Sequence, residues 1–173
     1  MNSNVILEGV KMQEVKNKLS WSEVPADVKE LLVLATDHWD NTTESEKYIN
    51  AALEKSGDHY DVLIGAYRYF FYKSNPSMAL QMAEKVIDKI QVEENLPENW
   101  EELKPILLRQ KEKPRIQLYL NAYAAIGYVL ARLGKVEEAT EISARIKEID
   151  QSRLSCASTV FEVLTRPPED DDD

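Results

Sequence analysis

Two short stretches of the chain place a histidine between carboxylates, a combination of side chains that can bind a metal ion or transfer a proton. They are Asp37-His38-Trp39-Asp40 and Asp58-His59-Tyr60-Asp61. On a helix, residues one or two apart point to different faces, and the sequence has no His-x3-His or Glu-x2-His pair. We therefore predict no metal site here. We expect Asp58 to cap a helix and Asp61 to interact with the dipole of its first turn.

Other reactive groups are equally isolated in the sequence. Cys156 is the single cysteine, has no histidine near it along the chain, and fits a packed thiol better than a nucleophile. The five glycines form no phosphate-binding loop. Since no pairing of nucleophile with base and no metal-ligand set emerges, the sequence predicts a protein that is not an enzyme and has no cofactor and no metal.

Composition limits the class of partner. The 173 residues carry a formal net charge of -10, and five of the acids form the run Glu169 to Asp173. Without that run the charge is still about -5, the wrong sign for a nucleic-acid partner. We find no apolar stretch long enough for a membrane span and no signal peptide. A lone cysteine fits a reducing compartment. We therefore expect a cytoplasmic protein, with one domain over 1–166 and a disordered acidic tail over 167–173.

Apolar residues recur at intervals of three and four almost everywhere, which predicts an all-α fold. The helices are expected at about 10–19, 25–39, 43–55, 58–73, 76–90, around Trp100 to Leu107, 115–133, 136–149 and 152–165. Thr43 and Glu46 match a capping box, and Asn75-Pro76 supplies a cap and a first-turn proline. Pro105 is expected to kink or break the helix around Trp100.

A spacing of small and large side chains recurs within these helix pairs. Its clearest copy consists of a large aromatic residue, apolar residues, a small helix residue, a turn glycine and an alanine: Tyr123, Ile126, Gly127, Leu130, Gly134 and Ala139. Glycine costs about 1 kcal/mol relative to alanine inside a helix. We therefore expect Gly127 to lie where the paired helix presses against its backbone, so that close packing offsets the cost.

Two further copies fit the same frame. Matching Ala79 to Ala139 brings Leu63, Ala66, Phe70, Asn75, Ala83 and Val86 into the same roles, with Tyr67 in place of the small residue. Matching Ser45 to Ala79 brings in Leu32, Ile49, Ala52 and Leu53, with Lys29 at the aromatic position. The step from Ala79 to Ala139 is 26 longer than the step from Ser45 to Ala79, and the excess coincides with a proline-rich segment.

The shorter step has the length of a tetratricopeptide repeat (TPR), and the pattern resembles that family over roughly 26–150. The resemblance implies a right-handed α-α superhelix, a TPR-like solenoid of about three helical hairpins at 26–59, 60–93 and 120–153. To these it adds an N-terminal helix, an insertion at about 91–117 and a C-terminal capping helix. An irregular helical bundle with coincidental spacings is the alternative.

In the TPR family the first helix of each hairpin lines a concave face that holds a segment of a partner protein. Carried over to this chain, the partner-binding positions are Ile64, Arg68, Phe71 and Tyr72 in the second hairpin and Asn121, Ala124, Tyr128 and Arg132 in the third. Members that clamp chaperone carboxylates use a lysine and asparagine set, and this chain has Ile64, Arg68, Ala124, Tyr128 and Arg132 at those positions instead. An apolar segment or amphipathic helix is therefore the expected ligand. Tyr67 and Phe70 are expected to be buried instead.

Function follows as an expectation from this resemblance. The leading interpretation is a noncatalytic protein-protein interaction module, an adaptor or a chaperone-like protein that binds a partner segment on the concave face. The alternatives are a bacterial type III secretion chaperone of the TPR class and a homodimeric structural scaffold. The insertion or the last helix could also fill the groove itself. Arg109 to Arg115 is locally basic but interrupted by Glu112. A solvated linker is its default interpretation, and a patch for an acidic partner is the alternative.

Overall fold

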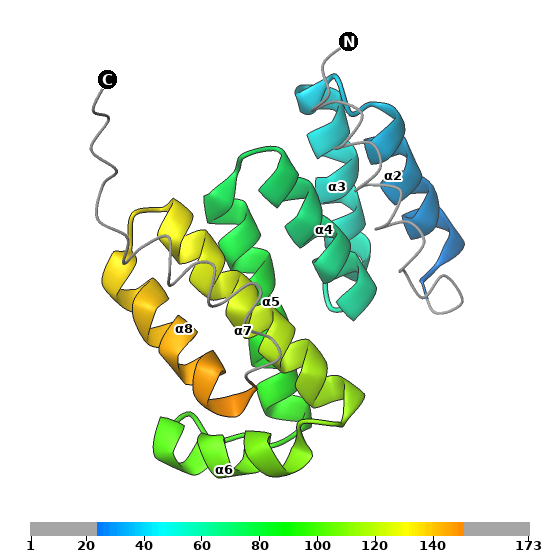
Figure 1. Ribbon diagram of the computed structural model, residues 1–173. Helices are drawn as coiled ribbons and strands as arrows, with labels where there is room; N and C mark the ends of the chain where they lie inside the picture. The colour runs from blue at the N-terminus through cyan, green and yellow to red at the C-terminus, as the bar shows by residue number, and fades with distance from the viewer. Residues whose placement is uncertain (1–23, 151–173) are drawn as a thin grey trace, which may run out of the picture. The chain divides into compact units, whose positions relative to one another are not determined.

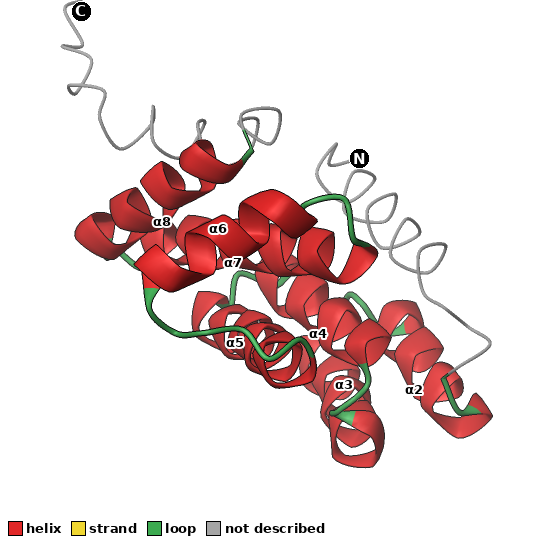
Figure 2. Cartoon of the chain, turned by 90° about the horizontal axis from the view of Figure 1, so that it is seen from below, coloured by secondary structure: helices red, strands yellow, loops and turns green. Residues whose placement is uncertain are grey.

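The described part of the chain is built entirely from helices (Figure 2). A computed structural model describes residues 24–150. The predicted helices at 10–19 and 152–165, Cys156 and the acidic tail lie outside the described residues. In chain order the helices are α2 (Ala26–Asp37), α3 (Thr42–Ser56), α4 (Tyr60–Tyr72), α5 (Pro76–Glu93), α6 (Trp100–Gln110), α7 (Pro114–Arg132) and α8 (Val136–Ile149) (Figure 1). The all-α prediction is confirmed for this part of the chain.

The chain divides into two compact units, 1–82 and 83–173, and the boundary falls inside α5. In the first unit α2 packs against α3, and α3 contacts α4. Its core consists of Val24, Val28, Leu32, Ala35, Ile49, Ala52, Val62, Leu63, Ala66, Tyr69, Phe70, Ala79 and Met82. Lys73, just after α4, donates to the carbonyl of Trp39 and lies 4.1 Å from the centre of its ring. This contact ties the end of α4 to the turn between α2 and α3.

In the second unit α7 packs against α8, and α6 contacts α8. The close packing expected at Gly127 is confirmed. A Cβ atom at this position would lie 2.9 Å from Cγ2 of Ile142 on α8, nearer than ordinary carbon contacts allow. Ala139, also on α8, is fully buried. The glycine therefore lets α7 and α8 approach at this point, as the sequence predicts.

Three helices end in the same hydrogen-bonded turn, the Schellman motif. After α7 the amide of Lys135 donates to the carbonyl of Leu130, and Gly134 between them has φ +79°. After α4 the amide of Asn75 donates to the carbonyl of Phe70, and Ser74 has φ +57°. A third copy, with Asn95 at φ +51°, ends α5. The sequence frame assigned the turn role to Asn75, but the left-handed residue is Ser74. Asn75 instead caps α5 by accepting from the amide of Met78.

Several helix boundaries depart from the sequence predictions. The cap of α3 is Asn41, whose side chain accepts from the amide of Glu44 at 3.2 Å, so the predicted capping box from Thr43 is wrong. The cap of α4 is His59, whose Nδ1 accepts from the amide of Asp61 at 3.2 Å, so the assignment to Asp58 is wrong. Asp61 does lie in the first turn.

The segment between α5 and α7 contains a helix of its own, α6. Asn99 begins α6 by accepting from the amides of Glu101 and Glu102 at 2.9 and 3.3 Å. The helix runs unbroken through Pro105, so the predicted break is wrong. Pro105 and Glu101 are both exposed, so water can reach the carbonyl of Glu101 that the proline leaves without an amide donor.

Candidate partner-binding surface

Burial repeats along the chain at the intervals that the sequence frame predicts. The second helices of the hairpins begin at Thr42, Pro76 and Val136, in the same two steps as the frame. In these helices three sets of equivalent positions are each at most 4% exposed: 45, 79 and 139; 49, 83 and 143; and 52, 86 and 146. In the first helices three sets of equivalent positions are each at most 8% exposed: 28, 62 and 122; 32, 66 and 126; and 35, 69 and 129. Successive helices therefore bury side chains at corresponding positions.

One departure from this pattern, a serine at a position that is otherwise alanine, has a physical explanation. Ser45 occupies the position that is alanine at 79 and 139, and its hydroxyl, being buried, donates to the carbonyl of Ala35 at 2.8 Å. A buried hydroxyl without such an acceptor would be destabilising. Serine is thus accommodated at the small-residue position because α2 supplies a carbonyl oxygen opposite it.

On α4, the structure places all the predicted binding residues on one incompletely buried face. Ile64, Arg68, Phe71 and Tyr72 are each partly exposed, at spacings of four, three and one residues. The Phe71 ring is stacked on Tyr67 with centroids 6.0 Å apart and meets Tyr72 edge-on at 5.4 Å. The aromatic rings therefore form one continuous surface beside Arg68.

The expectation that Tyr67 and Phe70 are buried holds for one of them. Phe70 is 1% exposed and meets Tyr69 edge-on at 5.3 Å. Tyr67 is partly exposed and belongs to the Phe71 stack, so its predicted burial is wrong. Tyr69, which the sequence reasoning missed, is the buried tyrosine of this helix at 1% exposed. Its place in a run of aromatic residues does not distinguish it, but its equivalence to Ala35 and Val129 in the repeat frame is a signal that could have found it.

The predicted residues on α7 also share one face. Asn121 and Arg132 are exposed, and Ala124 and Tyr128 are partly exposed. Gly127, which lies between them in the sequence, faces α8. Since α4 and α7 belong to different compact units, we describe their faces separately. Each face combines a tyrosine with an arginine, two residue types that often carry the binding energy of protein interfaces.

A cluster that the sequence reasoning missed holds the insertion helix to α8. Lys104 on α6 pairs with Glu148 on α8 at 3.2 Å, and the guanidinium of Arg145 lies 5.0 Å from the ring centre of Trp100. Arg145 also donates to the hydroxyl of Tyr123 on α7 at 3.2 Å. Next to Tyr123, burial raises the pKa of Tyr119 to about 12. These contacts fix α6 against α8 and leave the predicted binding residues of α7 outside the cluster.

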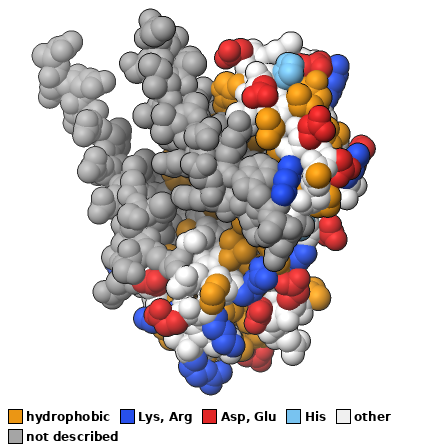
Figure 3. Space-filling model, turned by 90° about the vertical axis from the view of Figure 1, so that its right-hand side faces the viewer, with side chains coloured by type: hydrophobic (Ala, Val, Ile, Leu, Met, Phe, Trp, Pro, Cys, Tyr) orange, Lys and Arg blue, Asp and Glu red, His pale blue; other side chains and the backbone are white. Residues whose placement is uncertain are grey.

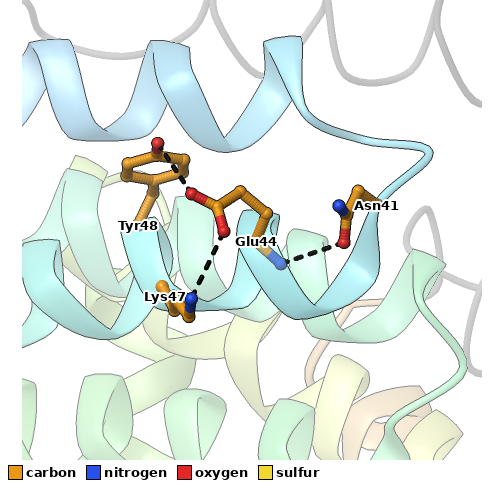
Figure 4. A network of polar contacts seen from close by, with 4 residues as sticks. All are labelled: Asn41, Glu44, Lys47 and Tyr48. Atoms are coloured by element: carbon orange, nitrogen blue, oxygen red, sulfur yellow. Dashed lines mark hydrogen bonds and ion pairs between the residues drawn. The ribbon is translucent and has the colours of Figure 1, made fainter.

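A polar network surrounds the start of α3 (Figure 4). The carboxylate of Glu44 accepts from Lys47 Nζ at 3.3 Å and from the Tyr48 hydroxyl at 3.1 Å. These two hydrogen bonds lower the pKa of Glu44, and the carboxylate raises the pKa of Tyr48. The donors stabilise the charged form of the acid, so the network supports the helix start and offers no group poised to exchange protons near neutral pH.

The two histidines that opened the sequence analysis contact backbone groups. His38 Nδ1 lies 2.9 Å from the carbonyl oxygen of Leu34, and His59 Nδ1 accepts from the amide of Asp61. Within residues 24–150 the structure has no group of three or more His, Cys, Asp or Glu side chains that could hold a metal ion. Over the same residues no helix is long and apolar enough to cross a membrane.

The described residues form an all-α chain in which successive helices bury side chains at corresponding positions. No family model matches the chain, and no solved structure matches it. The chain is similar to a curated protein of Azotobacter chroococcum mcd 1, described as "Uncharacterized 19.8 kDa protein in nifW 5'region". The two are 27% identical over 110 residues, which is 62% of each chain, so this chain covers less than two thirds of that relative's length.

Proposed function

We propose that this protein is a noncatalytic binding module of the TPR type, an adaptor or chaperone that holds a segment of another protein. The observation that supports this most strongly is the repetition of buried positions in three hairpins, at the same spacing as the starts of their second helices. In helical repeats of this kind each hairpin buries one set of side chains, and the faces left over form an extended binding surface.

The chemistry of the partly exposed faces of α4 and α7 favours a polypeptide ligand. The aromatic surface of Tyr67, Phe71 and Tyr72 on α4 offers large apolar contact area, with Arg68 beside it for a carboxylate or a carbonyl. Tyr128 and Arg132 supply the same pairing on α7. We propose that the ligand is an apolar or amphipathic polypeptide segment.

The relative's printed description supplies a first candidate ligand. Its gene lies in the 5' region of nifW. Chaperones are commonly encoded next to their clients, so the products of the genes that flank this chain's own gene should be tested first. A nifW product, where the genome has one, belongs in the same test.

The test is calorimetric titration of the purified chain with these candidates. We expect Arg68→Glu and Tyr128→Ala each to weaken binding by at least tenfold, about 1.4 kcal/mol. The matched controls are Lys85→Glu on α5 and Glu138→Ala on α8, both exposed positions on second helices of hairpins.

Unchanged affinity in both face variants, or equal losses in the controls, would contradict the proposed surface. Light scattering at several concentrations separates the scaffold alternative, because a stable homodimer would persist on dilution while an adaptor has no need of one. Secretion of a bound client through a type III apparatus would single out the export-chaperone alternative.

A further inference from the structure

Three basic side chains cluster where α6 turns into α7. Arg109 lies in the last turn of α6, Lys111 follows its end, and Lys113 immediately precedes α7. All three are exposed, in a protein whose formal net charge is -10. We call these three residues the basic turn. Figure 3 shows Lys and Arg side chains at the lower end of the face that it draws, with Asp and Glu side chains among them.

The fold uses the neighbouring basic residues but not these three. Lys104 pairs with Glu148 at 3.2 Å, and Arg115 approaches Glu93 at 4.0 Å. Within residues 24–150 none of the three residues of the basic turn makes an ion pair.

Helix electrostatics account for only part of the basic turn. A cation at the end of α6 interacts favourably with the helix dipole, which explains Arg109. Lys113 is the N-cap of α7, where the dipole disfavours a positive charge, and no acid lies in the first turn of that helix. Glu112, which is also exposed, lies between Lys111 and Lys113, so the turn keeps an excess of two positive charges. Such an excess indicates an anionic partner.

We infer that the acidic run Glu169 to Asp173 of the same chain docks on the basic turn. The run consists of five consecutive carboxylates, the chemical complement of three exposed cations. This inference is independent of the proposed function, because it rests on charge and on chain geometry and not on the faces of α4 and α7.

The acidic run lies within reach of the basic turn. Glu148, close to the end of α8, is fixed to Lys104 by their 3.2 Å ion pair. Along α6, the rise from Lys104 to Arg109 is about 7.5 Å. The tether between α8 and the run extends from Asp150 to Glu169. A chain of that length spans roughly 24 Å on average when unstructured and about 28 Å when wholly helical. Either length exceeds the distance along α6 from Lys104, which the end of α8 contacts, to Arg109.

Tethering makes a weak contact effective. Exposed ion pairs contribute little one by one and are screened by salt. An intramolecular ligand on a short tether, however, has an effective concentration in the millimolar range. The acidic run therefore occupies the basic turn at low ionic strength and leaves it as salt rises, and an external acidic segment has to compete with it.

The experiment is paramagnetic relaxation enhancement in the full chain. Asp173→Cys in a Cys156→Ser background carries a nitroxide label, and NMR reports attenuation of each backbone amide. At low ionic strength we expect the amides of residues 109–113 to be attenuated at least about twofold more than those at Lys85 and Lys147, exposed basic residues of the same unit. In 0.5 M salt, where the Debye length falls to about 4 Å, the difference should disappear.

The variant Lys111→Gln with Lys113→Gln should remove most of the excess attenuation, and Lys85→Gln should leave it unchanged. Equal attenuation at the basic turn and at the control lysines, or an excess that survives high salt, would overturn the proposal. Mixing spin-labelled unenriched chain with unlabelled isotope-enriched chain tests for a second copy. Excess attenuation that persists in the mixture would show that the run docks between molecules, which also overturns it.

Discussion

The contact between Gly127 and Ile142 makes Gly127→Ala the most informative change in the fold. A Cβ atom at Gly127 would lie 2.9 Å from Cγ2 and 3.4 Å from Cβ of Ile142. Carbon atoms prefer separations of about 3.5–4.0 Å. The side chain of Ile142 cannot turn its methyl group away easily, because a β-branched residue in a helix has one strongly preferred χ1 rotamer. The helices must therefore move apart to admit alanine.

Two opposing effects set the size of the change in stability. Alanine is favoured over glycine inside a helix by about 1 kcal/mol. Overpacking of a close helix contact costs about 1–3 kcal/mol. We therefore expect Gly127→Ala to lower the free energy of unfolding of the second unit by about 1 kcal/mol. A glycine without this contact would show the opposite sign, a gain of about 1 kcal/mol.

The assay is amide hydrogen exchange in α7 and α8, which reports the free energy of opening in that unit. A double-mutant cycle with Ile142→Ala isolates the contact. In that background the clash is absent, and Gly127→Ala should stabilise by about 1 kcal/mol. Ala144→Gly, at an exposed position of α8, calibrates the helix propensity and should cost about 1 kcal/mol. The reasoning is refuted if Gly127→Ala stabilises the wild-type and Ile142→Ala backgrounds equally.

Three further predictions concern caps and titrations. Asn99→Ala should destabilise α6 by about 1 kcal/mol in hydrogen exchange because two amides lose their acceptor, and a loss no larger than that from Asn50→Ala, an exposed position inside α3, would count against the cap. Burial raises the pKa of Tyr119 from 10.0 to about 12, so the stability that its neutral phenol contributes, roughly 2–3 kcal/mol, is present below pH 10 and is lost as pH rises towards 12. Chemical denaturation at several alkaline pH values measures this loss. The same fall in the free energy of unfolding between pH 10 and 12 in wild type and in Tyr119→Phe would contradict it. The pKa of Glu44 is lowered, so the stability that its carboxylate contributes to the folded state is present above pH 4.5 and is lost as pH falls through the folded pKa. An NMR titration midpoint below 4.5 that rises in Lys47→Gln would confirm this, and a midpoint unaffected by the variant would refute it.

The helices were predictable because they rest on local periodicity. The apolar spacing predicted the bounds of α8 without error, and the small residues Gly127 and Ala139 predicted the helix contact. Each of these signals lies within one helix pair and needs no knowledge of the rest of the chain.

Caps and breaks were less predictable because neighbouring residues compete. Asn41, Thr42 and Thr43 can all cap a helix, and the sequence alone does not decide between them. The penalty for Pro105 depends on whether solvent reaches the freed carbonyl, which is a property of the folded chain.

The cluster around Arg145 was missed for a different reason. It joins Trp100, Tyr123 and Arg145, which lie on three different helices. No spacing in the sequence links side chains separated by such an insertion. Helical spacing predicts that the residues proposed for binding share one face of α4 and one face of α7, whereas the stacking of Phe71 on Tyr67 required the structure.

The central claim is that the first helices of the repeated hairpins hold another polypeptide. Its most direct test is a photo-crosslinking residue placed at Tyr72 or Tyr128, with Lys85 and Glu138 as control positions, in the presence of the product of a flanking gene. The account predicts crosslinked products of the same mass from Tyr72 and Tyr128 and none from the control positions. Products from the control positions alone, or from none of the four, would contradict it.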